Sequence, residues 1–504
     1  MTPDIARLRA RVCADDALRI LPTLTDAPLH LVGGVVRDAL CGVNNTHADW
    51  DIVVPAGAFA LAQRFAAAIG GSYVPLHEAH PTARVVFRDT QYDFAEYREP
   101  TLNDDLRARD LTINAIAADL HALLAGVDVP LVDPCGGVDD LVSGILRPCG
   151  PDIFAADPVR IVRLYRFVAM LGFVATPEAE RQVRAVQAVR THDGGAWWWA
   201  TVAPERVTDE LARLFTASHA ATGITGLVRA GVLDAFVPYI AATRSLIQGP
   251  NHHLDVFDHN LAASVAVVGE FLVTRDAWAV PYADDLQQWL DAPTGGTRTR
   301  QWLVPFAALL HDVGKAITQA TKPNGKPEFP RHEAAGGHIA AQVATNLHLS
   351  RAERKALVAF VRYHGYPNAL QRHGADHALR FFAVVGDTAP GVILVAMGDR
   401  ATARGGARTS AKKVMRDIVF LQGLMREYFG VYAPLFAIPP LVRGDALIEA
   451  LALLPGRRIG ELLLLLRRRQ LDGTLSETSD ALDAARSLMA SRHPAHRLFL
   501  NGQR

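Results

Sequence analysis

The chain has 504 residues, half of them hydrophobic and 21% charged, which excludes a disordered tail and a disulfide-held miniprotein. Its 52 basic and 52 acidic side chains cancel, so any surface for a polyanion must be local. At roughly 150 residues per domain, the length predicts about three or four domains.

The beginning of the chain, MTPDIARLRARV, spaces Ile5, Leu8 and Val12 as one helix face and lacks the basic and apolar regions of an export signal. No uninterrupted apolar run approaches the roughly 18 to 20 residues of a membrane span. The four cysteines form no CxxC pair, which favours reduced thiols. We therefore expect a soluble, cytoplasmic protein that does not bind a membrane.

Up to about residue 150, short β-rich runs (LHLVGG, WDIVVP, ARVVF, YDFAEY) alternate with helical stretches such as AFALAQRFAAAIG. From residue 151 onward, apolar residues recur at helical spacing and strand signals nearly vanish. The predicted fold class is α+β, with a small mixed-sheet head followed by three all-α domains. The predicted domains are 1–150, 151–248, 249–405 and 406–504. The Gly- and Thr-rich residues 291–300 predict an exposed loop in the third domain.

The segment LVGGVVRDALCG places Gly33 and Gly34 between a strand ending at Val32 and a helix beginning near Val35. Two residues without side chains allow a triphosphate to approach the backbone, although a tight turn explains the pair equally well.

The next strand, ADWDIVVP, carries Asp49 and Asp51, which point to one face because they lie two residues apart. Two such carboxylates repel each other unless a cation lies between them, and oxygen ligands favour Mg²⁺. The alternative is a pair of solvated aspartates at a strand end. The strand therefore predicts a magnesium site beside the glycines.

The segment ADPVRIVRLYRF predicts a helix with Asp157 at its cap and Pro158 in its first turn. Arg160, Arg163 and Arg166 follow at steps of three and share a broad face, which suits a nucleotide cradle or a solvated basic surface. A carboxylate beside a guanidinium matches the donor and acceptor pattern that cytosine and adenine share, and not that of uracil or guanine. Asp157 and Arg160 are therefore candidate base-reading residues.

Three later segments, HLDVFDHN, ALLHDVGKA and MGDRATARG, carry histidine and aspartate in the order H, HD, D. The residues are His259, His311, Asp312 and Asp399. Imidazole and carboxylate together suit a divalent transition metal (Mn, Ni, Fe or Zn) and also tolerate Mg²⁺. His332 and His364 are further candidate ligands, equally explained as surface or supporting histidines. His338 is more typical of a structural histidine, and Lys315 is either a phosphate contact or solvated.

These motifs resemble two known families. GGVVRDALCG, DWD, RDLTINAIA at 109–117 and DPCGGVDDLVSGILR at 133–147 resemble, in order and spacing, the class II tRNA nucleotidyltransferase and poly(A) polymerase superfamily. The H, HD, D order resembles HD-type metal-dependent phosphohydrolases. The resemblance covers nearly the whole chain and implies a nucleotidyltransferase head, a nucleotide- and RNA-binding neck, an HD domain and a tRNA-binding tail.

The first resemblance also implies roles for single residues. It implies that Asp49 and Asp51 bind the catalytic Mg²⁺, that Gly34 and Arg37 contact the triphosphate, and that Arg109 contacts the nucleotide.

The neck helix matches the superfamily's EDxxR motif, with Ala156 where glutamate is usual. The match implies that Asp157 and Arg160 select the base and that Arg163 and Arg166 contact the nucleotide.

The implied function is the template-independent addition of C, C and A to the 3′ end of tRNA from CTP and ATP, without an obligate protein partner. The HD motif adds an expected phosphohydrolase activity. A poly(A) polymerase, or an enzyme that adds only CC or only A, stays open. Two alternatives of other classes are an HD phosphohydrolase with an inactive transferase head and a non-catalytic RNA-binding protein.

Overall fold

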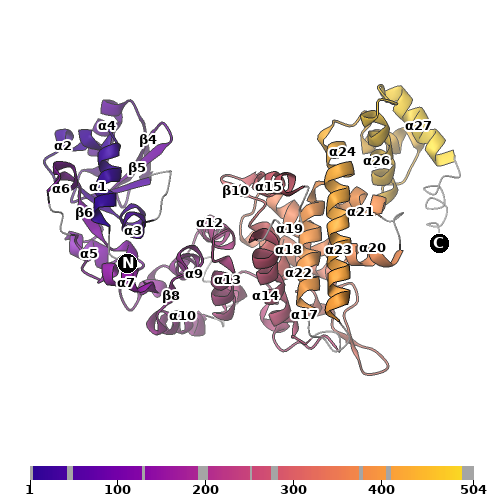
Figure 1. Ribbon diagram of the computed structural model, residues 1–504, viewed down its shortest axis with the longest axis horizontal. Helices are drawn as coiled ribbons and strands as arrows, with labels where there is room; N and C mark the ends of the chain where they lie inside the picture. Colours follow the sequence, from indigo (N-terminus) through magenta and orange to yellow (C-terminus); the bar gives the residue numbers. More distant parts are fainter. Residues whose placement is uncertain are drawn as a thin grey trace. The chain divides into compact units, whose positions relative to one another are not determined.

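A computed structural model of the protein describes residues 4–42, 49–127, 131–190, 202–249, 253–273, 282–373, 378–403 and 410–490. The chain packs as two compact units, Met1–Val202 and Ala203–Arg504 (Figure 1). The boundary between the units lies inside the predicted second domain, and the division into four domains stays a prediction.

Unit 1 is built on a six-stranded mixed sheet in the order β3-β4-β5-β2-β1-β6. Its strands are β1 (His30–Val32), β2 (Asp49–Val54), β3 (Ser72–His77), β4 (Thr82–Phe87), β5 (Thr90–Glu96) and β6 (Ala117–Asp119). Strands β2 and β5 are parallel, and the other neighbours in the sheet are antiparallel. The predicted mixed sheet is confirmed. The edge strands β3 and β6 were not predicted, because β3 contains a proline and β6 has only three residues.

The two faces of β2 have different surroundings. Trp50 lies beside Tyr92 of β5 in the strand register, and both rings are buried. Helix α4 (Ala58–Ile69) packs on this face, where the centroid of the Phe65 ring lies 5.1 Å from that of Tyr92. Because side chains alternate along a strand, Asp49 and Asp51 point to the opposite face.

Further helices complete unit 1. They are α1 (Ile5–Ala14), α2 (Leu21–Leu24), α3 (Gly34–Leu40), α5 (Leu102–Arg107), α6 (Leu120–Ala125), α7 (Gly137–Ser143), α8 (Ile153–Ala156), α9 (Val159–Leu171) and α10 (Pro177–Arg190), with the short 3₁₀ turns η1 (Leu18–Ile20) and η2 (Thr112–Asn114). Strands β7 (Ile145–Leu146) and β8 (Val174–Ala175) form a small parallel pair. Helix α3 begins at Gly34, one residue before its predicted start.

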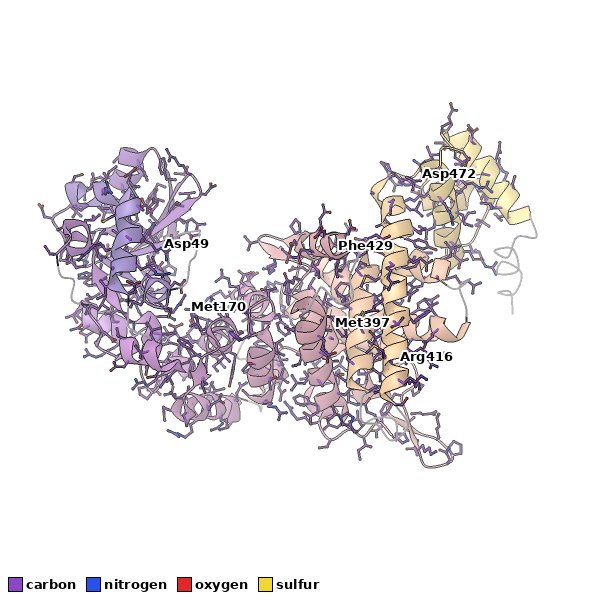
Figure 2. The ribbon with its side chains drawn as sticks, viewed as in Figure 1. Asp49, Met170, Met397, Arg416, Phe429 and Asp472 are labelled. Atoms are coloured by element: carbon purple, nitrogen blue, oxygen red, sulfur yellow. The ribbon has the colours of Figure 1, made fainter. Side chains whose placement is uncertain are left out.

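Unit 2 is mainly helical, as predicted. Its helices are α12 (Pro204–Phe215), α13 (Ala220–Arg229), α14 (Val256–Ala266), α15 (Ala283–Asp291), α16 (Leu303–Leu310), α17 (Lys315–Thr318), α18 (His332–Asn346), α19 (Arg351–Tyr363), α20 (Tyr366–His373), α21 (Ala378–Val385), α22 (Ala389–Thr402), α23 (Ala411–Glu427), α24 (Ala433–Ala437), α25 (Gly444–Leu451), α26 (Arg457–Leu471) and α27 (Thr478–Ala490). Helices α14, α16, α19 and α22 pack against one another, and Met397 on α22 is fully buried (Figure 2).

The predicted exposed loop at 291–300 is wrong. The segment forms a two-stranded hairpin of β9 (Pro293–Gly295) and β10 (Arg298–Thr299). Arg298 holds it in place, because its Nε donates to the buried Glu353 carboxylate at 2.8 Å and its Nη1 to Asp209 at 2.6 Å. The sequence pattern of Gly, Thr and Arg indicated a loop. It could not reveal the contacts that hold the hairpin, because the partners of Arg298 lie far away in the sequence.

One stretch within the described residues, Ala378–Thr402, is long and apolar enough to cross a membrane. An 18-residue window of this stretch has a mean hydropathy of 1.7, and 78% of that window is buried inside the protein, as in the core helix of a folded domain. The sequence reading did not single out this stretch.

Candidate functional sites

Three carboxylates meet on one face of the unit 1 sheet. Asp49 is exposed at the start of β2 (Figure 2), and Asp51 lies beside Asp93 of β5 in the parallel register. Burial, Asp93 and Asp49 raise the pKa of Asp51 to about 6, although Arg109 opposes them. Arg84 holds Asp93 through two hydrogen bonds of 2.7 Å. This crowding of negative charge favours a bound cation.

Gly33 and Arg109 complete this site. Gly33 has φ +71° and ψ −133°, a conformation that essentially only glycine adopts. A Cβ atom there would lie 3.1 Å from Asp51 Oδ2 and 3.6 Å from Arg109 Nη1, so the three residues converge. Arg109 Nη2 lies 3.3 Å from Asp105 Oδ2, and its buried Nε has no hydrogen-bond partner among the described residues. A glycine turn, a carboxylate and a guanidinium thus surround one point, as a metal-bound triphosphate requires.

The predicted triphosphate contact, Arg37, is buried. Its Nη1 donates to Asn114 Oδ1 at 2.7 Å, its Nε donates to Asp38 Oδ1 at 2.8 Å, and its guanidinium lies 4.9 Å from the centre of the Phe167 ring. These contacts join α3 to η2 and α9. The contact of Arg37 and Gly34 with a triphosphate stays a prediction.

The segment 133–147 packs against η2. Asp140 accepts hydrogen bonds from the Thr112 hydroxyl at 2.5 Å and from Arg147 Nε at 2.9 Å. A Cβ at Gly137 would lie 2.1 Å from the Thr112 carbonyl oxygen, so only glycine permits this approach. The segment therefore holds RDLTINA in place and contributes packing rather than chemistry.

The neck helix starts one residue later than predicted. Helix α9 begins at Val159 with Pro158 in the cap position, and Asp157 Oδ1, one residue earlier, accepts a hydrogen bond from the Val159 amide at 3.3 Å. The side chains of Asp157 and Arg160 are both partly exposed. Burial lowers the pKa of Arg160, although Asp110 and Asp157 oppose this shift. Base selection by the pair stays a prediction.

The three neck arginines do not share one exposed face, which corrects the sequence interpretation. Arg166 is buried, with its guanidinium 3.9 Å from the centre of the Phe167 ring. Arg163 is paired with Asp110, at 2.8 Å from its Nε and 2.7 Å from its Nη2. Arg163 thus ties α9 to the head, whereas Arg166 packs on Phe167 of the same helix. The predicted nucleotide contacts of both arginines remain predictions.

Asp110 is a buried carboxylate with an unusually low pKa. Burial alone would raise the pKa of Asp110, but Arg163 and hydrogen bonds from Asn114 and Leu111 lower this pKa to about 2. The ionised form is therefore part of the folded structure.

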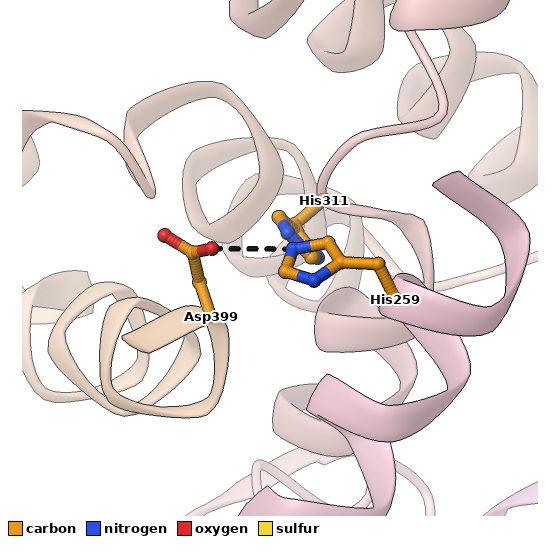
Figure 3. Close-up of side chains that lie close together, drawn as sticks. All are labelled: His259, His311 and Asp399. Atoms are coloured by element: carbon orange, nitrogen blue, oxygen red, sulfur yellow. Dashed lines mark ion pairs between the residues drawn. The ribbon is translucent and has the colours of Figure 1, made fainter. Parts of the chain in front are cut away.

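Unit 2 contains a second cluster, in which four histidines surround Asp312. The distances from each Nε2 to the nearer Asp312 oxygen are 3.7 Å for His259, 3.4 Å for His311, 3.2 Å for His332 and 3.7 Å for His364. His259 Nε2 also lies 3.2 Å from Asp399 Oδ1 (Figure 3). His259 and His311 face Oδ2 of Asp312, whereas His332 and His364 face Oδ1. Every predicted ligand therefore lies in one cluster.

The other ring nitrogen of each histidine is already engaged. Nδ1 of His311, His332 and His364 lies 2.7 to 2.9 Å from the carbonyl oxygen three residues earlier, so each Nδ1 carries the proton. The Thr402 hydroxyl donates to the Asp399 carbonyl and therefore accepts from Nδ1 of His259, at 3.1 Å. All four Nε2 atoms consequently point at the centre of the cluster, as in histidine metal sites. Burial would lower the pKa of His311 and His332, but Asp312 outweighs burial and raises the pKa of both, so a metal ion binding there displaces protons from these two rings.

The electrostatics also suit a metal. The pKa of Asp312 lies well below its usual range despite burial, because Lys315 and the histidines favour the charged form. Burial and His311 lower the pKa of His364 to about 4, so this imidazole is neutral at physiological pH, as a ligand must be. Nε2 of His311 is buried without a hydrogen-bond partner among the described residues. The donor set therefore fits a divalent ion.

Sequence reasoning missed Gln248 and Thr402, which lie beside this cluster. Thr402 orients His259, and Gln248 Oε1 accepts a hydrogen bond from Lys315 Nζ at 2.6 Å. Lys315, expected to be a phosphate contact or solvated, is buried and also donates to Asp312 Oδ2 at 2.5 Å. No motif marks Gln248, because it lies in a connecting segment. His338 is exposed on α18 and lies outside the cluster.

The comparisons with known proteins agree with the head geometry. The poly(A) polymerase head domain family matches residues 29–147, and the family described as a probable RNA- and SrmB-binding site of polymerase A matches residues 200–243. An A-adding tRNA nucleotidyltransferase of Deinococcus radiodurans is 36% identical over 453 residues, covering 90% of this chain and 93% of the relative. A multifunctional CCA protein of Halorhodospira halophila is 34% identical and covers 66% of this chain and 72% of the relative.

A solved structure of a CCA-adding enzyme in complex with ATP has the same fold, with a TM-score of 0.57 at 20% identity, over 97% of this chain and 99% of that one. The mixed sheet, with its paired carboxylates beside a glycine turn, lies within the residues that the poly(A) polymerase head family matches. The chain belongs to the superfamily of tRNA nucleotidyltransferases and poly(A) polymerases. It is a nucleotidyltransferase, and its family acts with a divalent metal ion.

We expect Gly33→Ala to abolish most nucleotide addition, because the new methyl group meets Asp51 Oδ2. It should also cost roughly 1 to 3 kcal/mol in stability through its backbone conformation. Addition of labelled nucleotide and the unfolding midpoint are measured together. Gly70→Ala is the control, since Gly70 also has φ +71° but nothing lies within 4 Å of its Cβ position. Equal activity per folded molecule in the two variants contradicts the site.

We expect the stabilisation by Asp110 to depend on pH. The folded pKa of about 2 lies below the ordinary value of 3.8, so the stabilisation is present above pH 4 and is lost as the pH falls toward 2. The gap between the unmodified chain and Asp110→Asn in urea unfolding should therefore shrink by about 2 kcal/mol across this range. A gap that stays constant between pH 6 and pH 3 contradicts the ion pair with Arg163.

Proposed function

We propose that the chain adds C, C and A to the 3′ end of tRNA, using CTP and ATP. The observation that carries this proposal is the convergence of Gly33, Asp51 and Arg109 on one point beside Asp49. The partly exposed Asp157 and Arg160, which suit cytosine and adenine and exclude uracil and guanine, support it.

Each residue then has a role in the transfer. Asp49 and Asp51 hold the Mg²⁺, which when bound supplies a lower pKa for the RNA 3′-hydroxyl and neutralises the departing pyrophosphate. Gly33 leaves room for the triphosphate, and Arg109 donates hydrogen bonds to it. The 3′-oxygen forms a bond to the α-phosphorus, the bond from this phosphorus to the oxygen that bridges to the β-phosphate breaks, and pyrophosphate leaves. The nucleotidyl group is therefore transferred directly, without a covalent enzyme intermediate.

An enzyme that adds only the terminal A is the second candidate. The observation that favours it is the 36% identity, over 90% of this chain, to a relative whose name is A-adding tRNA nucleotidyltransferase. Addition of CC alone and poly(A) synthesis share the same head chemistry. The accepted primer therefore decides between the candidates.

We expect purified protein with Mg²⁺, CTP and ATP to extend a tRNA transcript that ends at the discriminator base by C, C and A, and then to stop. A transcript that already ends in CC should receive one A. Sequencing of the new 3′ ends checks both results. The control is the double variant Asp49→Ala, Asp51→Ala, which should add nothing above background.

Each other outcome has a defined meaning. Extension of the CC-ending transcript alone identifies an A-adding enzyme, addition of two C residues alone identifies a CC-adding enzyme, and a long A tract identifies a poly(A) polymerase. Absence of addition to any of these primers overturns the proposal.

We also propose that unit 2 binds a divalent metal at the histidine cluster and hydrolyses phosphate esters as an HD domain does. Mn, Ni, Fe or Zn suit the donor set, and Mg²⁺ is tolerated. Asp312 has one oxygen toward His259 and His311 and the other toward His332 and His364, so its carboxylate fits between two ions. Such a pair of ions is the usual arrangement for hydrolysing phosphate esters. Lys315 and Arg400 add positive charge for a phosphate.

We expect His332→Ala to lose about half of the bound transition metal and any phosphodiesterase activity, because it removes one ligand from the Oδ1 side of Asp312. Metal analysis of the purified chain and hydrolysis of 2′,3′-cyclic nucleotides measure the two effects. His338→Ala lies on the same helix with an exposed side chain and should change neither. A metal content that is unaffected by both His332→Ala and His311→Ala contradicts the cluster as a metal site.

The remaining expectations concern the context of the reaction. We propose that helices of the C-terminal region, beyond residue 405, hold the tRNA, and that the protein acts in the cytoplasm, where charged and uncharged tRNA circulate. We propose that the head transfers the nucleotide, the neck binds nucleotide and RNA, the HD domain binds the second metal, and the tail holds the tRNA.

A further inference from the structure

The carboxylate of Asp15 is hydrogen-bonded to side chains of β2, which carries Asp49 and Asp51, and of the neighbouring strand β5. Asp15 Oδ2 accepts hydrogen bonds from Trp50 Nε1 at 2.8 Å and from the Tyr92 hydroxyl at 2.9 Å. Trp50 and Tyr92 lie side by side on β2 and β5, with only 2% of each residue exposed. Asp15 is therefore hydrogen-bonded to both parallel strands, β2 and β5, on the sheet face opposite Asp49 and Asp51.

Asp15 is itself held firmly. Its Oδ1 accepts hydrogen bonds from the amides of Ala17 at 3.0 Å and Leu18 at 3.2 Å, which fixes the carboxylate at the start of the turn η1. Burial and the nearby Asp15 raise the pKa of Tyr92, so its hydroxyl stays protonated and donates. The N-terminal segment that carries Asp15 thus fixes both the indole of Trp50 and the phenol of Tyr92.

The position of Trp50 gives this bond a consequence for the reaction. Trp50 stands between Asp49 and Asp51 in the chain, and Tyr92 precedes Asp93. Because alternate residues of a strand point to opposite faces, a rotation of the Trp50 backbone moves both neighbouring carboxylates on the other face. Metal ligands must be held within about 0.5 Å of the productive geometry, and outer groups that orient them matter for affinity.

We propose that Asp15 is a positioning residue for the head metal site, acting through Trp50 and Tyr92 on Asp49 and Asp51. The proposal rests on the proposed function of that site. It assigns to the N-terminal segment a role in metal affinity and in the rate of nucleotide addition, in addition to its role in packing.

The structural alternative is that Asp15 merely stabilises unit 1 as a cap of η1. A matched cap exists at the other end of the same strand pair. Glu96 ends β5, and its Oε1 accepts hydrogen bonds from the amides of Gly57 at 2.7 Å and Ala58 at 3.2 Å, at the start of α4. Glu96→Gln thus weakens a cap in the same unit without touching Trp50, which makes it the control for loss of stability alone.

The test compares Asp15→Asn, Trp50→Phe, Tyr92→Phe and Glu96→Gln in the full chain. Mn²⁺ binding without nucleotide is followed by electron paramagnetic resonance, and the binding of an otherwise identical chain with Asp49→Ala is subtracted to remove the contribution of the histidine cluster. Unfolding midpoints, and kcat and KM for ATP addition to a CC-ending tRNA, are measured on the same proteins.

We expect Asp15→Asn and Trp50→Phe to weaken Mn²⁺ binding at the head about 10-fold and to lower kcat with KM for ATP nearly unchanged. Excess Mn²⁺ should restore part of the rate. The double variant should bind Mn²⁺ no more weakly than the worse single variant, because both changes break the same hydrogen bond. Tyr92→Phe should have a smaller effect in the same direction, and Glu96→Gln should change stability alone.

The proposal is overturned if Asp15→Asn lowers the unfolding midpoint as Glu96→Gln does but leaves Mn²⁺ affinity and kcat per folded molecule unchanged, or if the two single effects simply add. Failure of the underlying function looks different: the subtraction then leaves no Mn²⁺ binding at the head, because Asp49→Ala and the unmodified chain bind alike.

Discussion

The repulsion among carboxylates on one strand pair is the constraint on which unit 1 depends. Burial, and after it the flanking Asp93 and Asp49, raise the pKa of Asp51 to about 6, so the ionised site carries an electrostatic cost that a cation would reduce. The neighbours limit this cost in different ways. Arg84 neutralises Asp93, Arg109 approaches Asp51, and Gly33 keeps side-chain atoms out of the space between them. A bound cation at this point would relieve the local repulsion, as the proposed metal site requires.

Unit 2 also contains a buried carboxylate, but histidines surround it instead of further carboxylates. Asp312 is buried among four imidazoles, and backbone carbonyls or the Thr402 hydroxyl engage every Nδ1. The tautomers are therefore set by helix geometry before any ion binds, because a histidine near a helix end reaches the carbonyl three residues earlier. Oxygen ligands on a strand suit magnesium with phosphates, whereas nitrogen ligands between helices suit a transition metal. The donor atoms of the two clusters therefore differ.

Within unit 1, arginines connect the head to the neck helix. Arg37, Arg163 and Arg166 all lie against the ring of Phe167, and Arg163 also neutralises Asp110 next to Arg109. The turn at Asp157 is therefore joined through α9 to Asp110, the neighbour of Arg109. If Asp157 and Arg160 select the base as proposed, this connection links base selection to the transfer chemistry of the head.

The sequence by itself determined the mixed-sheet head, the helical remainder, the aspartate pair and the H, HD, D residues, because period-two strands, helical spacing and adjacent polar residues are local patterns. Only the tertiary structure decided that His332 and His364 join the cluster, that Arg166 is buried, that residues 291–300 form a hairpin and that Asp15 is hydrogen-bonded to Trp50. The cluster, the hairpin and the Asp15 contact each depend on residues distant in the chain: Asp312, Glu353, and Trp50 with Tyr92. Local patterns specify which side chains are available, whereas long-range packing specifies which of them meet.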